Sequence, residues 1–418
     1  MSINKIRDFL LSRKAIVENA SYLSVLQIVL LLAPLITYPY LVRVLGMELY
    51  GVIVSAQVLV SYASIIIDFG TNSVCTKHVS INRDNPKMLS EIVSSVLLIR
   101  SLLSLICFAI YVIVVLLIPA YREYFLLFLL TYGLVLQEIL FPQYFFQGIE
   151  NMKYVTIINV LFKAIFIALI FIVVKSPKDF ILVPILYVIG YTVSSVTSII
   201  IIVKMGIKLR MPKLDRVLVY VKDSSPLLAT SIIGTIKDKF NYFFIGSSIG
   251  MSDVVIYDLG IKLNGFIAKP VNIMEIVMFP RFAKSRNFKN IKRFAVFSFF
   301  CSLTMCALLN LFLPFLVDFF LHEQVDMFPI RLLSIAPVIL AISGILGNDF
   351  MVAFGYNKYV FYSIIFTTCA YIMSLLSVII LGLDNSLYAF VYIALISYFA
   401  ELVYRLYATR KIIKRGIN

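Results

Sequence analysis

The stretch YVTIINVLFKAIFIALIFIVV, residues 154–174, decides the class of fold because it is long and apolar enough to cross a lipid bilayer. A helix rises 1.5 Å per residue, so about 20 apolar residues span the roughly 30 Å hydrocarbon core. Comparable stretches recur along the chain, which is 61% hydrophobic and 14% charged, with a mean hydropathy of +0.98. Soluble domains carry about a quarter charged residues. The sequence therefore predicts an all-α polytopic membrane protein.

The apolar stretches predict about 12 transmembrane helices, and a polar central loop divides them into six and six. We expect an N-lobe of helices 1–6 in residues 1–203, a cytoplasmic linker in residues 204–224, and a C-lobe of helices 7–12 with a basic cytoplasmic tail in residues 225–418. A weak repeat supports two halves, because LGMELYGVIVSAQVL (45–59) aligns with IGMSDVVIYDLGIKL (249–263). Secondary transporters are often built from such repeats. The expected helices are residues 20–42, 49–70, 92–118, 123–145, 154–174, 180–203, 225–249, 254–279, 293–318, 328–353, 358–381 and 386–408.

Lysines and arginines are distributed unevenly over the two sides of this topology. One side carries 26, the other four, and seven lie inside the predicted helices. Because basic loops stay in the cytoplasm, both termini are expected there. No small-residue cleavage site follows the first apolar run, so that run is expected to stay as the first span. The basic clusters are short juxtamembrane loops, which favours membrane lipids as their neighbours and excludes a nucleic-acid partner.

Several chemistries find no support in the sequence. The five cysteines show no CxxC spacing, only two histidines are present, and no phosphate-binding GxxxxGK[ST] loop occurs. We therefore expect no metal site, no catalytic residues and no cofactor. Whether a proton or sodium gradient drives the protein stays open at this point.

The seven basic residues inside the predicted helices are the main functional signal. A cation at the centre of a spanning helix costs about 2.5–3.5 kcal/mol on insertion scales, so several of them imply a wet cavity and an anionic substrate. Lys163 lies midway along residues 154–174, too deep for its side chain to reach either headgroup layer. We expect Arg100, Arg331, Asp68 and Asp349 nearer the membrane interfaces. The alternative to a cavity is an interhelical ion-pair network that uses Glu138, Asp238, Asp258 and Glu275.

Residues 254–279 carry the most regular polar pattern. Asp258, Lys262, Gly265, Lys269 and Asn272 follow spacings of 4, 3, 4 and 3, which place them within an arc of roughly 80° on one helix. Asp258 and Lys262 are expected to pair, whereas Lys269 has no acid three or four residues away. The expected substrate-binding residues are Lys163, Lys237, Lys239, Lys262, Lys269 and Asn272. If transport is coupled to ions, the expected carriers are Glu138, Asp238 and Asp258.

The sharpest motifs lie in the first 155 residues. The run PLITYPYLVRVLG (34–46), followed by Tyr50-Gly51, resembles the opening of Wzx-type polysaccharide flippases of the multidrug/oligosaccharidyl-lipid/polysaccharide (MOP) superfamily. Residues 68–72 (DFGTN) and 141–154 (FPQYFFQGIENMKY) also resemble that family. In physical terms, prolines bend a helix and glycines permit a tight turn. We therefore expect a conformational role for Pro34, Pro39, Arg43, Gly46 and Gly51.

This resemblance implies a fold of two six-helix lobes around a central cavity. It also implies a flippase of the bacterial inner membrane that moves an undecaprenyl-diphosphate-linked oligosaccharide between leaflets by alternating access. It also implies partnership with polysaccharide polymerase and chain-length machinery. Two alternatives remain. A multidrug or ion antiporter of the same superfamily predicts an acidic lumen for cationic drugs, whereas lysines dominate here. A polysaccharide polymerase or other membrane enzyme predicts long outward loops with catalytic residues, whereas the outward loops here are short.

Overall fold

The structure is a computed structural model, and it describes the backbone of residues 21–22, 25–26, 28–29 and 32–414. The side chains of residues 229–230, 233 and 236–238 lie outside the described part. Every regular element among the described residues is a helix, and none is a strand. The predicted all-α class is therefore confirmed.

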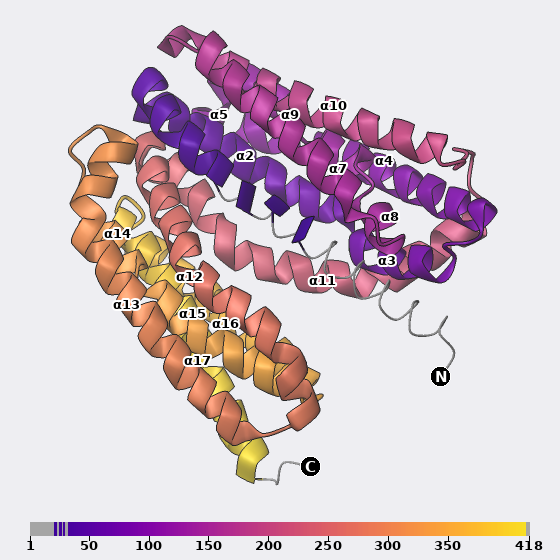
Figure 1. Cartoon of the computed structure of the whole chain (residues 1–418). Helices are drawn as coiled ribbons and strands as arrows, with labels where there is room; N and C mark the ends of the chain where they lie inside the picture. Colours follow the sequence, from indigo (N-terminus) through magenta and orange to yellow (C-terminus); the bar gives the residue numbers. More distant parts are fainter. Residues whose placement is uncertain (1–20, 23–24, 27, 30–31, 415–418) are drawn as a thin grey trace. The chain divides into compact units, whose positions relative to one another are not determined.

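The chain divides into two compact units, coloured from indigo to pink and from salmon to yellow along the sequence (Figure 1). Unit 1 comprises Met1–Leu49 and Ala56–Ile232, and unit 2 comprises Tyr50–Ser55 and Ile233–Asn418. The division falls inside two helices, α2 (Met47–Asp68) and α11 (Leu214–Phe244). Residues 204–224, which we expected to form a linker, group with unit 1, and three of their apolar side chains, Ile207, Val217 and Tyr220, are buried.

Unit 1 contains the first half of the helices, several of them broken into shorter pieces. Prolines and glycines lie at most of the breaks, since they remove a backbone donor or permit a left-handed turn. Phe69 and Gly70, for example, have φ of 53° and 74° and separate α2 from α3. Its elements are the helix Leu32–Leu45, α2 (Met47–Asp68), α3 (Thr71–Ile81), α4 (Pro86–Leu117), α5 (Pro119–Arg122), α6 (Phe125–Tyr132), α7 (Val135–Leu140), α8 (Gln143–Gly148), α9 (Met152–Val173), η1 (Pro177–Ile181), α10 (Leu182–Lys204) and the start of α11.

Unit 2 contains the second half, including two π-helical segments. Such π-helical segments are rare in proteins and often lie at functional sites. The elements are η2 (Ile245–Ile249), α12 (Met251–Ser285), α13 (Phe288–Leu321), α14 (Phe328–Leu333), α15 (Ala336–Gly344), η3 (Ile345–Val352), α16 (Asn357–Ile380) and α17 (Leu387–Lys414).

Each predicted helix range coincides with a helical segment where the chain is described. Nine of the described helical segments are long and apolar enough to cross a membrane, and Leu32–Leu45 is a shorter apolar helix. Charged residues interrupt the apolar stretches of α11 and α12, so these two helices are not among the nine. The protein is thus a multi-pass membrane protein, and the count of 12 stays a prediction.

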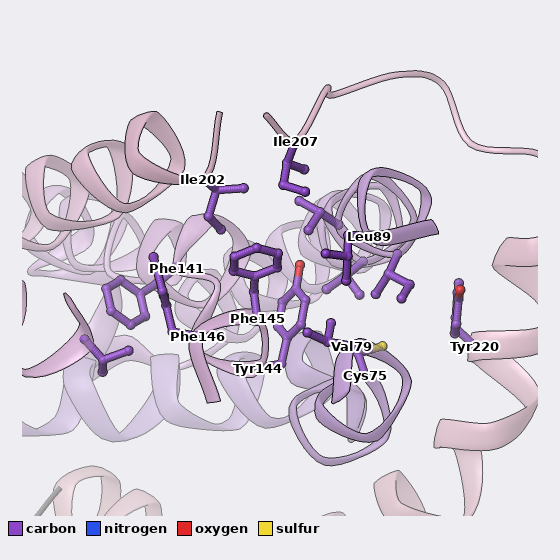
Figure 2. Packing of buried hydrophobic residues seen from close by; sticks show 14 of the residues in the cluster. Cys75, Val79, Leu89, Phe141, Tyr144, Phe145, Phe146, Ile202, Ile207 and Tyr220 are labelled. Atoms are coloured by element: carbon purple, nitrogen blue, oxygen red, sulfur yellow. The ribbon is translucent and has the colours of Figure 1, made fainter. Parts of the chain in front are cut away.

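The aromatic residues after Phe141 build much of the core of unit 1. Tyr144, Phe145 and Phe146 of α8 are at most 2% exposed and pack among apolar residues of α3 and α4 (Figure 2). Gly148 permits this approach, because a Cβ atom there would lie 2.5 Å from Cγ1 of Val79. Small residues allow helices in membranes to approach closely, since packing rather than the hydrophobic effect holds them together.

In each half of the chain, one helix begins directly after a glycine. Gly46 directly precedes α2, which starts at Met47, and Gly250 directly precedes α12, which starts at Met251. Gly46 has φ of 82°, a conformation that favours glycine. The aligned Gly-Met pairs of the sequence repeat therefore occupy equivalent positions in the two halves.

Candidate functional site

Lys163 lies in the middle of α9 without an acidic partner. Its side chain is half-buried, and its Nζ lies 5.6 Å from the centroid of the Tyr191 ring of α10. Tyr187, one turn earlier, stacks on Tyr191 with ring centroids 6.3 Å apart. No carboxylate within the described part of the chain pairs with Lys163. A cation–π contact stabilises an ammonium but leaves its charge uncompensated, so this position attracts an anion.

The Asp258–Lys262 pair in unit 2 is confirmed. The Lys262 ammonium contacts the Asp258 carboxylate, and Tyr242 of α11 donates a hydrogen bond of 3.1 Å to the other carboxylate oxygen. Asp258 is only 5% exposed. The charge of Lys262 is therefore largely compensated, because its i,i+4 partner is buried beside it.

Further along α12, the predicted polar stripe reaches the exposed face of the helix. Lys269 is half-buried and Asn272 is exposed, while Leu263, Ile267 and Val271 on the other face are buried in unit 2. Among the described residues, Lys269 makes no ion pair or hydrogen bond. Lys269 is thus the member of the stripe whose positive charge is uncompensated.

Two predicted site residues on α11 cannot be placed beyond the backbone. The side chains of Lys237 and Asp238 lie outside the described residues. Lys239, the next residue of α11, is half-buried. The roles of all three residues in substrate binding and ion coupling stay predictions.

Arg100 forms a buried charge cluster in unit 1 that the sequence did not predict. We expected Arg100 near an interface, but its side chain is 1% exposed. Its Nη2 lies 2.7 Å from Oδ1 of Asp68 and 3.8 Å from Oε1 of Glu138. Its Nε donates to Oγ1 of Thr71 at 3.0 Å, and the Tyr144 ring lies 5.5 Å from its guanidinium carbon. One arginine therefore holds two carboxylates from α2 and α7.

A second buried arginine organises unit 2. Arg405, one of the basic residues near the C-terminal end of the chain, is 8% exposed within α17. It pairs with Glu401 at 2.8 Å and donates to the carbonyl oxygen of Ser343 at 2.7 Å and the hydroxyl of Ser363 at 3.2 Å. Gly347 makes room for it, because a Cβ atom there would lie 2.6 Å from the guanidinium.

Asp349 is buried, although we expected it near a membrane interface. This residue of η3 is 0% exposed, and within the described part of the chain neither carboxylate oxygen has a hydrogen-bond partner. Glu275 of α12 lies nearby in unit 2, with Oε1 3.1 Å from the Cβ position of Gly344. A buried carboxylate without a partner is strongly destabilised as an anion, so Asp349 is suited to hold a proton or to meet a cation.

The proline and glycine motif forms a helix end and a close helix approach. Pro34 and Pro39 lie within the helix Leu32–Leu45, where Arg43 is exposed, and Gly46 ends that helix. Gly51 lies in the short segment that groups with unit 2. A Cβ atom at Gly51 would lie 1.9 Å from the carbonyl oxygen of Met251, so only glycine fits this approach.

The described residues contain no group of three or more histidine, cysteine, aspartate or glutamate side chains placed to hold a metal ion. Each unit instead contains lysine and carboxylate side chains that are buried or half-buried. Such an arrangement can bind an anion and exchange protons.

Comparison with solved structures defines the class. The chain has the fold of MOP superfamily transporters, with a TM-score of 0.72 to an inward closed structure of the lipid II flippase MurJ at 14% identity, over 94% of this chain and 87% of that chain. An inward-facing multidrug resistance transporter of the MATE family gives a TM-score of 0.66 at 16% identity, over 91% and 95% of the two chains. At these identities the likeness concerns the fold.

The sequence comparison gives the family. Residues 16–286 match the profile of the family described as polysaccharide biosynthesis protein, and the chain belongs to that family. It is 26% identical over 257 residues to a protein of Escherichia coli (strain K12) named "Putative O-antigen transporter", covering 61% of this chain and 57% of that protein. A protein of the same name from Shigella dysenteriae is 24% identical over 335 residues, covering 78% and 84%. The matched region thus spans little more than half of the first relative.

Proposed function

We propose that this protein is a flippase that moves an undecaprenyl-diphosphate-linked oligosaccharide across the bacterial inner membrane by alternating access. The observation that carries this proposal is the pair of uncompensated lysines, Lys163 of α9 in unit 1 and Lys269 of α12 in unit 2. The family and the names of the two relatives support a lipid-linked saccharide as the cargo.

Each lysine would contact a phosphate or a sugar hydroxyl of the cargo. Hydrogen bonds from an ammonium to phosphate oxygens are short and about twice as strong as neutral ones. In a cavity of low dielectric, an unpaired lysine attracts an anion more strongly than it would in water. Lys262 and Asn272 would add polar contacts along the same face of α12, with Lys237 and Lys239 as further candidates on α11.

We propose a proton or a sodium ion as the coupling ion, with buried carboxylates as its carriers. Glu138 is held by Arg100 and Asp258 by Lys262, so each would release its basic partner when it is neutralised. Asp349, which has no partner among the described residues, adds a fourth candidate to Glu138, Asp238 and Asp258. Transport into proteoliposomes that does not respond to either gradient would exclude this coupling.

The experiment for the proposed function is complementation. A strain that lacks its own O-antigen flippase would receive this protein together with a matching saccharide pathway. Surface polysaccharide should be restored by the natural protein and lost with Lys163→Ala, while lipid-linked saccharide accumulates in the cytoplasmic leaflet. The solvent-exposed Lys178→Ala on the η1 turn is the matched control and should retain export. Full export by Lys163→Ala at normal protein level would remove this residue from the site.

Efflux of cationic dyes separates the flippase from a multidrug antiporter. The uncompensated lysines should repel such dyes, so cells that produce the protein should accumulate as much ethidium as cells that do not.

A further inference from the structure

Residues 204–222 run from the end of α10 into the first turns of α11. One side of this segment packs against the rest of unit 1. Ile207, Val217 and Tyr220 are 2%, 7% and 3% exposed and belong to the same apolar cluster as Leu89 of α4 (Figure 2). His78 of α3 packs edge-on against Tyr220, with ring centroids 5.2 Å apart. This side of residues 204–222 is therefore a fixed part of the unit.

Backbone hydrogen bonds hold the non-helical part of the segment in place. The amides of Lys208 and Arg210 donate to the hydroxyl groups of Ser90 and Ser94 at 2.9 and 3.1 Å. Ser90 and Ser94 are one turn apart on α4, so the segment follows that helix. Among the described residues, the side chains of Lys208 and Arg210 make no hydrogen bond or ion pair.

The opposite side of the segment combines exposed apolar and basic side chains. Met211, Leu214 and Leu218 are 89%, 69% and 56% exposed. Leu214 and Leu218 are one turn apart at the start of α11, so they share a face beside the buried residues Val217 and Tyr220. The basic residues of the segment are Lys204, Lys208, Arg210, Lys213, Arg216 and Lys222. The acidic residues beside them are fewer: Asp215, Asp223, which lies 3.3 Å from His78, and Glu91 of α4, which lies 3.9 Å from Arg216.

The position of the segment in the chain indicates what covers this side. Lys204 is the last residue of a helix that qualifies as a membrane span, so the residues that follow it lie at the headgroup layer. Apolar side chains next to lysines and arginines are typical of elements that lie in a membrane interface and prefer anionic lipids. Long basic side chains can reach the headgroups while apolar ones enter the acyl region.

We propose that residues 204–222 form an interfacial element that binds the headgroups of anionic phospholipids, with Met211, Leu214 and Leu218 inserted at the acyl boundary. This element would fix one end of α11 to both unit 1 and the leaflet surface. The inference is independent of the proposed cargo, because it concerns bulk phospholipid and residues outside the lysine sites.

The absence of tryptophan from the sequence allows a direct test. Met211→Trp supplies a single fluorophore, and the full-length variant is placed in vesicles of phosphatidylcholine and phosphatidylglycerol, with one of the two lipids brominated. We expect brominated lipid to quench the introduced tryptophan. Brominated phosphatidylglycerol should quench it at least about twofold more than its bulk fraction predicts. Glu323→Trp, on the exposed polar turn after α13, is the matched control and should show no such preference.

The basic side chains are then tested separately. Lys208→Gln, Arg210→Gln and Lys213→Gln, combined with Met211→Trp, should abolish the preference for the anionic lipid while the backbone bonds to α4 stay intact. A preference that survives these three substitutions overturns the proposal. Quenching by aqueous iodide alone also overturns the proposal, because it would place this side of the segment in water. Shielding from both quenchers also overturns it, since unit 2, another copy or another protein would then cover this side.

Discussion

Arg100 and Asp68 form an ion pair of 2.7 Å at the point where α2 ends and α3 begins. Arg100 reaches this break from α4 and also donates to the Glu138 carbonyl oxygen at 2.5 Å. The same break contacts α11, because a Cβ atom at Gly70 would lie 2.7 Å from Cβ of Leu227. One buried guanidinium therefore ties together the helix break, α4 and α7, at the place where α11 packs on unit 1.

Removal of Arg100 should destabilise the protein severely. Arg100→Ala leaves Asp68 and Glu138 without their counter-charge, and breaking a buried ion pair from one side costs about 3–5 kcal/mol. We expect a loss of folded protein in detergent, measured by thermal unfolding with size-exclusion detection. Arg100→Ala combined with Asp68→Asn and Glu138→Gln should recover part of the loss, because no carboxylate is then uncompensated. Equal stability of the single and triple variants would show that the loss of stability comes from lost packing and not from uncompensated charge.

Gly347 should be essential for the Arg405 cluster. Gly347→Ala places a methyl group 2.6 Å from the guanidinium, so Arg405 must move and lose its bonds to Ser343 and Glu401. The expected result is a lower unfolding temperature. Gly265→Ala on α12 is the matched control, since no atom lies within 4 Å of the new methyl group. That control should be neutral or slightly stabilising, because alanine favours a helix over glycine by about 1 kcal/mol.

The sequence located the helices and the mid-helix cations better than it located their partners. Hydrophobic length predicts where a helix lies, and helical periodicity placed Asp258 beside Lys262. Periodicity describes only the faces of one helix. It could not show that Arg100 meets Asp68, 32 residues earlier, or that Arg405 meets Ser343, 62 residues away. For the same reason, Asp349 was expected at an interface although it is buried in unit 2.

The topology itself is testable. The distribution of 26 basic residues against four predicts that both termini are cytoplasmic. A green fluorescent reporter fused after Asn418 should fluoresce, and alkaline phosphatase at the same position should be inactive. Fusion of the same phosphatase at Lys178, on the η1 turn, should be active and serves as the control. Phosphatase activity at the C-terminus would reverse the assigned orientation.

The two lysines of α12 should differ in their importance for transport. Lys262 is paired with buried Asp258, whereas Lys269, two turns further along the same helix, has no ion-pair partner among the described residues. A substrate phosphate should therefore gain more from Lys269. We expect Lys269→Ala to reduce export in the complementation strain about tenfold, equivalent to about 1.4 kcal/mol, and Lys262→Ala to reduce it less.

Lys269→Arg should be tolerated better than either alanine variant, because it retains the positive charge and its donors. The second readout is stability, since Lys262→Ala leaves Asp258 buried without its counter-charge and should lower the unfolding temperature. Lys269→Ala should not lower it, because no internal bond is lost. The opposite order, with Lys262→Ala the more harmful for export at equal protein level, would assign the anion contact to Lys262 and make Lys269 a lipid-facing residue.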